Sequence, residues 1–289
     1  MAYELGKKIL LNDGIVYGVV MDSNLKTKHI RIDNVLDLQN TQGSKYAQSF
    51  IGDTFRKIKE DLKKQKKVLF IGSPCQVAGL KKYLNSDYEN LLTVDLVCHG
   101  NVPNEYIKSY AKGINKKTNK VTFREKREYC LKLYQGNKVI KKLKKDKYLY
   151  AFLRDISLKE SCYHCIYAQN KRVGDITLGD FWALESDIPY SIVMTNTNKG
   201  LKMLESLESV VLEEKEINKS IENNDSFNHP QGKHSSRIYF NNGVVDGFNA
   251  GLKSARINKI MRRDNYPQIL KKLLFIISNK VNNIRNGHN

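Results

Sequence analysis

The 289-residue sequence has no long apolar run, no recognisable secretion signal and few cysteines, and each absence excludes a class of protein. Its apolar runs all fall far short of the ~20 residues of a membrane-spanning helix, so we expect no transmembrane segment. The opening "MAYELGKKILLNDG" carries an early acid and lacks a basic region before an apolar stretch, so we expect a cytoplasmic protein. Five cysteines, an odd number, argue against a disulfide framework and leave metal binding or buried thiols.

Acidic residues are also scarce, with 30 Asp and Glu against 49 Lys and Arg, so the net charge is +19. Nine of the basic residues and one acid lie in residues 250–289, which gives this stretch a charge of +8. No zinc-finger, homeodomain or RNA-recognition pattern accompanies the charge, so no nucleic-acid partner is expected. Two interpretations remain: ordinary solvated lysines, or attraction of an anionic cofactor or an acidic redox partner.

The order of apolar patterns predicts a mixed α/β protein. Buried strands are expected at 67–72 and 91–98, joined by a helix over 74–84 whose first residue, a proline, needs no N–H there. This strand–helix–strand unit predicts a parallel crossover in a central sheet. The other expected elements are strands at 14–22, 28–33, 175–181 and 191–197, helices at 49–65 and 103–114, an antiparallel meander over 121–144 with a turn at 135–136, and a mainly helical region from 199 onward.

Four of the five cysteines lie where open α/β sheets bind ligands. Cys75 is in the first turn of the helix after the 67–72 strand, and Cys98 is at the carboxyl end of the 91–98 strand, so both are expected at one sheet edge. A helix N-terminus also stabilises a thiolate, the form that binds metal. Cys162 and Cys165 have C-x2-C spacing and can place two sulfurs on one ion or cluster. The sequence therefore predicts a four-thiolate site.

The residues alone leave three interpretations of these cysteines open: structural zinc, an iron–sulfur cluster, or buried thiols without a ligand. Zinc sites usually use two compact C-x2-C hairpins, whereas single cysteines at strand ends suit a redox cluster better. Composition does not separate the two metals. Cys130 lies in an apolar stripe, "YCLKLY", and is expected to be a packed core residue.

Several motifs, in this order and spacing, resemble the beta-subunit family of coenzyme F420-reducing hydrogenases and F420-linked dehydrogenases. They are "GIVYGVVMD", "GSKYAQS", "GSPCQVAGLKKYL", "DLVCHG" and "SCYHC…RVGDITLGDFW", with weaker similarity at "SSRIYFNN". The resemblance implies an iron–sulfur flavoprotein that passes electrons between a [4Fe–4S] cluster, FAD and a deazaflavin such as coenzyme F420, or another acceptor. It implies as cluster ligands Cys75, Cys98, Cys162 and Cys165.

The sequence departs from this family at two points. Many members carry a ferredoxin-like C-x2-C-x2-C-x3-C-P run that is absent here, which suggests a short member supplied by an acidic ferredoxin or flavodoxin-like electron carrier. The family commonly has Val-Pro-Ser and glycine where this chain has Asn101-Val102-Pro103 and Ala183, so the acceptor is left open. Related proteins also occur in organisms without F420, often beside surface-polysaccharide genes.

A flavin site has to be sought without a G-x-G-x-x-G fingerprint, which the sequence lacks. Two turns are candidates for binding the flavin phosphates. One contains a glycine, a hydroxyl, a cation and an aromatic ring, and the other has free backbone N–H groups beside a helix start. The expected contacts are Gly43, Ser44, Lys45, Tyr46, Gly72, Ser73, Pro74 and Gln76. For both turns an ordinary surface turn is the alternative.

Three polar residues near the motifs have both functional and structural interpretations. His99, next to Cys98, could tune a cluster through a hydrogen bond or could simply pack or face solvent. Asp175 and Asp180 flank "ITLG", where capping of loops is the ordinary role.

We interpret the sequence as an iron–sulfur flavoprotein oxidoreductase. Residues 1–198 are expected to form the cluster and flavin domain, and residues 199–289 a helical, basic region. The alternative from another class is a non-catalytic, zinc-stabilised accessory protein of a glycan pathway. A nucleic-acid-binding protein is a third interpretation that rests on charge alone. Iron, sulfide and zinc contents of anaerobically purified protein separate the first two.

Overall fold

The computed structural model describes residues 1–126, 128–181, 190–221 and 224–264. The chain divides into two compact units, residues 1–233 and 234–289, and each is described by itself. The predicted division into a cofactor-binding domain, residues 1–198, and a helical, basic region, residues 199–289, stays a prediction. In the structure, the segment 199–233 belongs to the first compact unit. Among the described residues, none of the helices is both long and apolar enough to cross a membrane.

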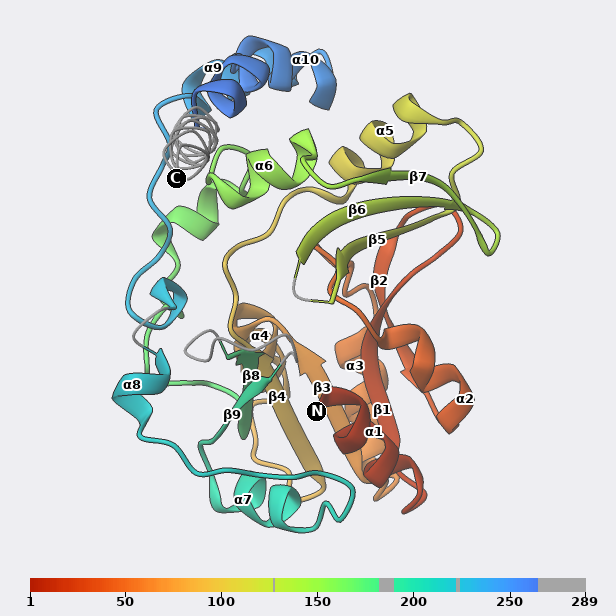
Figure 1. The fold of residues 1–289 in the computed structure, drawn as a ribbon. Helices are drawn as coiled ribbons and strands as arrows, with labels where there is room; N and C mark the ends of the chain where they lie inside the picture. The colour runs from red at the N-terminus through yellow and green to blue at the C-terminus, as the bar shows by residue number, and fades with distance from the viewer. Residues whose placement is uncertain (127, 182–189, 222–223, 265–289) are drawn as a thin grey trace, which may run out of the picture. The chain divides into compact units, whose positions relative to one another are not determined.

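A six-stranded sheet with strand order β2-β1-β3-β4-β8-β9 forms the centre of the first unit (Figure 1). Its inner strands β1, β3, β4 and β8 pair in parallel, and its edge strands β2 and β9 pair antiparallel to their neighbours. The strands are β1 (Ile15–Met21), β2 (Thr27–Ile32), β3 (Val68–Gly72), β4 (Leu91–Leu96), β8 (Ile176–Asp180) and β9 (Ser191–Thr195).

The first unit also contains helices and short 3-10 helices. They are α1 (Ala2–Leu10), α2 (Val35–Leu38), η1 (Gln39–Thr41), α3 (Thr54–Lys63), α4 (Pro74–Leu84), α5 (Asn104–Ile114), α6 (Lys147–Leu153), η2 (Glu160–His164), α7 (Asn198–Glu205), α8 (Ile217–Ile221) and η3 (Asp225–Phe227). The helix α4 joins β3 to its parallel neighbour β4, as the strand–helix–strand pattern predicts.

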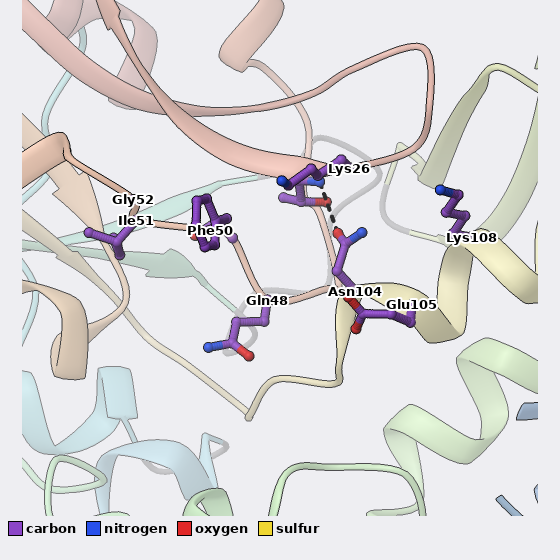
Figure 2. A pocket seen from close by; sticks show the side chains of 10 residues that line it. Lys26, Gln48, Phe50, Ile51, Gly52, Asn104, Glu105 and Lys108 are labelled. Atoms are coloured by element: carbon purple, nitrogen blue, oxygen red, sulfur yellow. Dashed lines mark hydrogen bonds between the residues drawn. The ribbon is translucent and has the colours of Figure 1, made fainter. Parts of the chain in front are cut away.

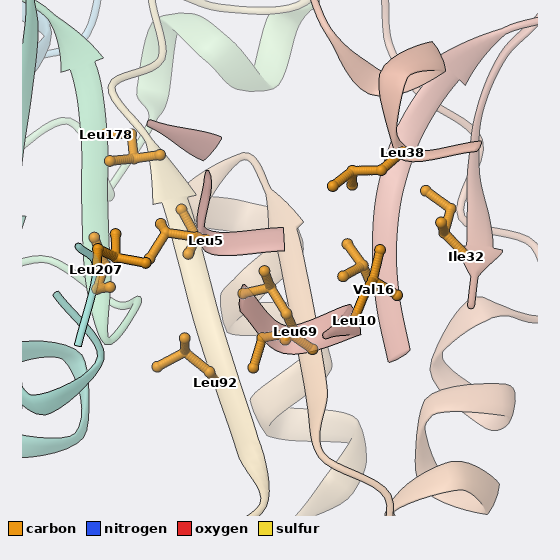
Figure 3. Close-up of a cluster of buried hydrophobic side chains, with 12 residues drawn as sticks. Leu5, Leu10, Val16, Ile32, Leu38, Leu69, Leu92, Leu178 and Leu207 are labelled. Atoms are coloured by element: carbon orange, nitrogen blue, oxygen red, sulfur yellow. The ribbon is translucent and has the colours of Figure 1, made fainter. Parts of the chain in front are cut away.

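Alternation along the strands divides the core into two layers, because successive side chains of a strand point to opposite faces. Val16, Leu69 and Leu92 pack on one face with α1 and α2 (Figure 3). Their neighbours along the strands pack on the other face with α3 and α4. Both faces are covered, as inner parallel strands require.

A second, three-stranded antiparallel sheet contains β5 (Lys120–Glu125), β6 (Glu128–Gln135) and β7 (Lys138–Leu143). Cys130 on β6 is fully buried in this sheet, as its apolar stripe predicts. The central sheet with its parallel crossover, the antiparallel meander and the helices after residue 198 confirm the predicted mixed α/β fold class.

Three local predictions differ from the structure. The helix expected over 49–65 begins at Thr54, because Phe50 is extended and exchanges backbone hydrogen bonds with Thr27 and His29 of β2. The meander turn lies at 136–137, one residue later than expected, with Gly136 at φ +58°. The helix α1 is an addition to the predicted elements, although its buried residues Leu5 and Ile9 have helical spacing.

The second unit, residues 234–289, contains α9 (Arg237–Val244) and α10 (Phe248–Ser254). The two helices pack through Phe240 and Phe248, whose rings meet edge to face with centroids 5.7 Å apart. Gly243 allows this approach, because a Cβ there would lie 2.2 Å from the hydroxyl of Ser254. The apolar, basic stretch after residue 265, which carries +4 of the +8 charge, lies outside the described residues.

A buried histidine on β2 predicts a pH-dependent stability. The Nε2 atom of His29 lies 3.1 Å from the carbonyl oxygen of Ile71, and its ring stacks on Phe70 with centroids 5.1 Å apart. Burial lowers the pKa of His29 to about 4. Between this pKa and the unfolded-state value near 6.5 the unfolded chain binds more protons, so acidification destabilises the fold, by about 3 kcal/mol for this group.

We therefore expect the free energy of unfolding to fall from pH 7 to pH 4.5 more steeply in the wild type than in His29→Gln, which keeps a side-chain donor. Urea unfolding of both proteins over a pH series measures the difference. Parallel curves for the two would show that His29 is protonated equally well in the folded and unfolded states.

Candidate metal centre

The carboxyl ends of β3 and β4 bring cysteines from separate parts of the chain to one edge of the sheet. Cys75 is the second residue of α4, directly after β3, and Cys98 follows β4 by two residues. Cys162 lies in η2 and Cys165 at its C-terminal end. Because β3 and β4 are parallel neighbours, both of their carboxyl ends open at the same edge, as the sequence predicts.

Electrostatic effects link the Cys98 thiol to the other three cysteines of the predicted site. Burial is the main cause that raises the pKa of Cys98, to about 12, and Cys75, Cys162 and Cys165 raise it further. Burial also raises the pKa of Cys162, again with a contribution from Cys75 and Cys165. A bound cation or cluster would reverse this effect, because it stabilises thiolates.

Backbone N–H groups point at two of the sulfurs. The N–H of Asn101 donates to the Cys162 sulfur over 3.3 Å, and the N–H of Gly100 donates to Cys98. Gly100 has φ +148°, and a Cβ there would lie 2.8 Å from Leu158, so the turn after Cys98 needs glycine. Donors to sulfur are among the features that tune iron–sulfur clusters.

The turn after Cys98 and the segment before Cys162 are held together directly. The N–H of Lys159 donates to the carbonyl of Asn101 over 2.8 Å, and the N–H of Cys162 donates to the carbonyl of Lys159 over 2.9 Å. The two cysteine-bearing segments therefore form one continuous backbone network, which fixes the Cys162 sulfur beside the end of β4.

His99 points toward an acid. Its Nε2 atom lies 2.8 Å from a carboxylate oxygen of Asp155, and its ring packs on Phe152 with centroids 4.9 Å apart. A hydrogen bond from His99 to a cluster ligand stays a prediction. Asp175 caps a loop, as expected, by accepting from the N–H and hydroxyl of Thr93 and from the hydroxyl of Thr197.

A buried ion pair beside the cysteines was missed by the sequence reasoning. Asp95 on β4 pairs with Arg172 over 2.8 Å, and their side chains are 0% and 1% exposed. The available signal was an aspartate in the otherwise apolar strand "LLTVDLV", since a charged residue in a buried strand needs a partner. Sequence pattern does not identify that partner, which lies 77 residues away.

In the first predicted flavin turn, residues 43–46, the lysine side chain binds backbone carbonyl groups of the turn and of the residues just before it. The Lys45 ammonium donates to the carbonyls of Thr41, Gln42 and Gly43 over 2.7, 2.9 and 3.1 Å. Burial lowers its pKa to about 8. Gly43 has φ +79°, and Ser44 is exposed. The lysine therefore stabilises the turn, which the sequence did not indicate.

Tyr46, the aromatic residue of the same turn, is half-buried against other aromatic rings. Its ring stacks on Phe152 with centroids 4.9 Å apart and lies 5.6 Å from Phe123 and 5.8 Å from Tyr129. Burial raises its pKa. Phe152 also contacts His99, so this aromatic cluster reaches from the 43–46 turn to the residue beside Cys98.

The second predicted flavin turn, Gly72 to Gln76, is a capped helix start. Pro74 is the first residue of α4, and the Gln76 side chain accepts from the Ser73 N–H over 3.0 Å. The Ser73 hydroxyl lies 3.2 Å from the Cys75 sulfur, so this turn touches the cysteine site. The Gln76 amide also donates to the Ser49 hydroxyl over 2.9 Å.

Ser49 in turn lines a pocket of about 620 Å³ (Figure 2). Lys26 and Phe50 lie on one part of its wall, with the ammonium 4.6 Å from the ring centroid, and Lys108 of α5 lies on another. The predicted flavin contacts do not line this pocket, but Gln76 links the α4 turn to its wall.

Within the described part of the chain, three or more His, Cys, Asp or Glu side chains are nowhere gathered closely enough to hold a single metal ion. The donor set nevertheless fits an iron–sulfur cluster: four thiols from three segments, with backbone donors on two sulfurs. In a [4Fe–4S] cluster with four cysteine ligands each thiolate binds a different iron, so the sulfurs need not surround one ion.

Comparison with known proteins decides the family. Residues 65–220, more than half of the chain and including all four cysteines, match the family described as the C terminus of the beta subunit of coenzyme F420 hydrogenase/dehydrogenase. The chain belongs to this beta-subunit family. Membership identifies it as a redox protein of the hydrogenase beta-subunit type.

Two further comparisons concern individual proteins. No curated protein matches the chain. Among solved structures, a chain of the F420-reducing [NiFe] hydrogenase complex from Methanosarcina barkeri is similar over 71% of this chain and 70% of its own, with 17% identity and a TM-score of 0.49.

Proposed function

We propose that this beta-subunit family member is an electron-transfer oxidoreductase that binds a [4Fe–4S] cluster through Cys75, Cys98, Cys162 and Cys165. One observation carries the proposal: Cys75 and Cys98 lie at the carboxyl ends of neighbouring parallel strands, and hydrogen bonds hold the segment of Cys162 and Cys165 against the turn after Cys98. When bound, such a cluster accepts and releases single electrons. The protein contributes the four ligands, the donors from Gly100 and Asn101, and the burial of Cys98.

Anaerobic purification tests this function. We expect brown protein with iron and sulfide each near ~4 per chain. Colourless protein with stoichiometric zinc would instead support the zinc-stabilised accessory protein of a glycan pathway. Visible absorption and the electron paramagnetic resonance spectrum of the dithionite-reduced protein then distinguish a [4Fe–4S] cluster from loosely bound iron.

We further propose FAD as the second cofactor, with a deazaflavin such as coenzyme F420 or another small molecule as acceptor. The family relationship and two turns support this part of the proposal. The Ser73–Gln76 turn touches Cys75, and the 43–46 turn reaches His99 through Tyr46 and Phe152. A flavin ring beside either turn would therefore be close to the cluster ligands.

Lys45→Ala is expected to weaken FAD binding about ten- to hundredfold, whether Lys45 contacts the pyrophosphate or holds the turn that does, because a charge-assisted hydrogen bond contributes about 1.5–3 kcal/mol. Quenching of flavin fluorescence measures the affinity. Lys108→Ala is the matched comparison, since this lysine lines the pocket but not the turn. A loss in Lys108→Ala alone would place the pyrophosphate in the pocket.

The proposed electron donor is an acidic ferredoxin or flavodoxin-like carrier, supported by the net charge of +19. Opposite charges raise encounter rates roughly tenfold or more at low salt, and salt screens this gain. We expect stopped-flow reduction by a reduced acidic ferredoxin to slow at least tenfold from low to high ionic strength. Truncation from residue 266, outside the described residues, should flatten that dependence; an unchanged salt slope would exclude the tail as the docking region.

A further inference from the structure

The pair of Asp95 and Arg172 is almost completely buried. The Arg172 Nη2 and Nε atoms donate to one Asp95 oxygen over 2.8 and 3.2 Å, and the Phe227 ring covers the guanidinium at 5.6 Å. Burying two charges costs more than their attraction returns unless the geometry is good and further hydrogen bonds satisfy both groups. Both conditions are met here.

The remaining acceptors of Asp95 bind the loop that precedes β8 and β8 itself. Its second oxygen accepts from the N–H groups of Val173 and Gly174 over 3.1 and 2.7 Å, and its first also accepts from the Thr177 hydroxyl over 2.8 Å. The carboxylate on β4 thereby fixes the backbone around Arg172 against the strand that leads to Cys98.

Arg172 uses its other N–H groups on carbonyls of both cysteine-bearing segments. Nη2 donates to Leu96 over 3.1 Å, and Leu96 is two residues before Cys98. Nη1 donates to Tyr167 over 3.2 Å, and Tyr167 is two residues after Cys165. One planar guanidinium therefore joins the backbone on the two sides of the site, which the single ammonium of a lysine cannot reproduce.

We propose that Arg172, held by Asp95, is the positioning residue of the four-cysteine site and sets the spacing between Cys98 and the Cys162–Cys165 segment. This inference rests on the proposed cluster. Each thiolate of a cluster must meet its own iron, so a shift of one segment weakens at least one iron–sulfur bond. Arg172 touches none of the four sulfurs and acts only through the backbone that carries them.

The test compares Arg172→Lys with Arg31→Lys after the same anaerobic reconstitution. Arg31 on β2 also pairs with a buried aspartate, Asp61, over 2.9 Å, but it lies on an edge strand that β1 separates from β3 and β4, the strands that lead to Cys75 and Cys98. We expect iron release to a chelator to be at least tenfold faster in Arg172→Lys than in the wild type, with an altered signal of the reduced cluster, while Arg31→Lys keeps wild-type values. Thermal unfolding of the wild type and both variants tests whether the difference in iron release follows from a difference in stability.

A double variant keeps the proposal testable if the single one does not fold. Asp95→Asn with Arg172→Met removes both buried charges, which is often neutral for stability, and also removes the links to Leu96 and Tyr167. Wild-type release rates in the folded variants would overturn the positioning role alone. Wild-type protein without iron and sulfide would overturn the proposed function and this inference together.

Discussion

Cys98→Ser and Cys162→Ser are each expected to abolish cluster binding, with iron and sulfide falling from about four per chain to a small fraction of that. A cluster with four protein ligands needs every thiolate, and a serine hydroxyl does not replace a soft sulfur donor.

Cys130→Ser is the matched control for this result. Cys130 is fully buried on β6 of the second sheet, so the substitution places a hydroxyl in an apolar site and lowers stability by about 1–3 kcal/mol. We expect it to keep iron and sulfide at wild-type levels. Iron lost from Cys130→Ser but retained in Cys98→Ser would refute the assigned ligand set.

The positions of these cysteines could be predicted because they depend on local signals. A proline at the start of α4 and two short apolar strands place Cys75 and Cys98 at the same sheet edge. The predicted start of α3 was wrong because it depends on a contact between distant parts of the chain. Phe50 fits a helical spacing, but its backbone pairs with β2, and that long-range contact outweighs the local pattern.

The polar contacts around the site could not be predicted in the same way. Asp95 and Arg172 are 77 residues apart, and the register of β4 with β8, Asp95 opposite Thr177, brings them together. The sequence presents Lys45 as a cation available to a phosphate, yet the left-handed backbone at Gly43 turns carbonyls of the same turn toward it. Contacts such as these depend on the backbone geometry of the folded chain, which cannot be derived from the amino-acid composition.

Gly174→Ala is expected to destabilise the fold by about 3 kcal/mol, because overpacking against rigid backbone is among the costly core substitutions. A Cβ at Gly174 would lie 2.7 Å from the Asp95 nitrogen and 2.9 Å from the Ile176 oxygen. Both are backbone atoms of paired strands, β4 and β8, so neither can move without breaking ladder hydrogen bonds. Relief therefore requires the loop to shift away from Asp95.

Such a shift would also break the 2.7 Å bond from the Gly174 N–H to Asp95 and displace Arg172. We therefore expect Gly174→Ala to lose both stability, measured by urea unfolding, and iron, measured after reconstitution. Gly232→Ala is the control, since nothing lies within 4 Å of a Cβ there, and a change within about 0.5 kcal/mol is expected. Equal stability of the two variants would mean that β4 and the loop before β8 are not packed as closely as their backbone contacts indicate.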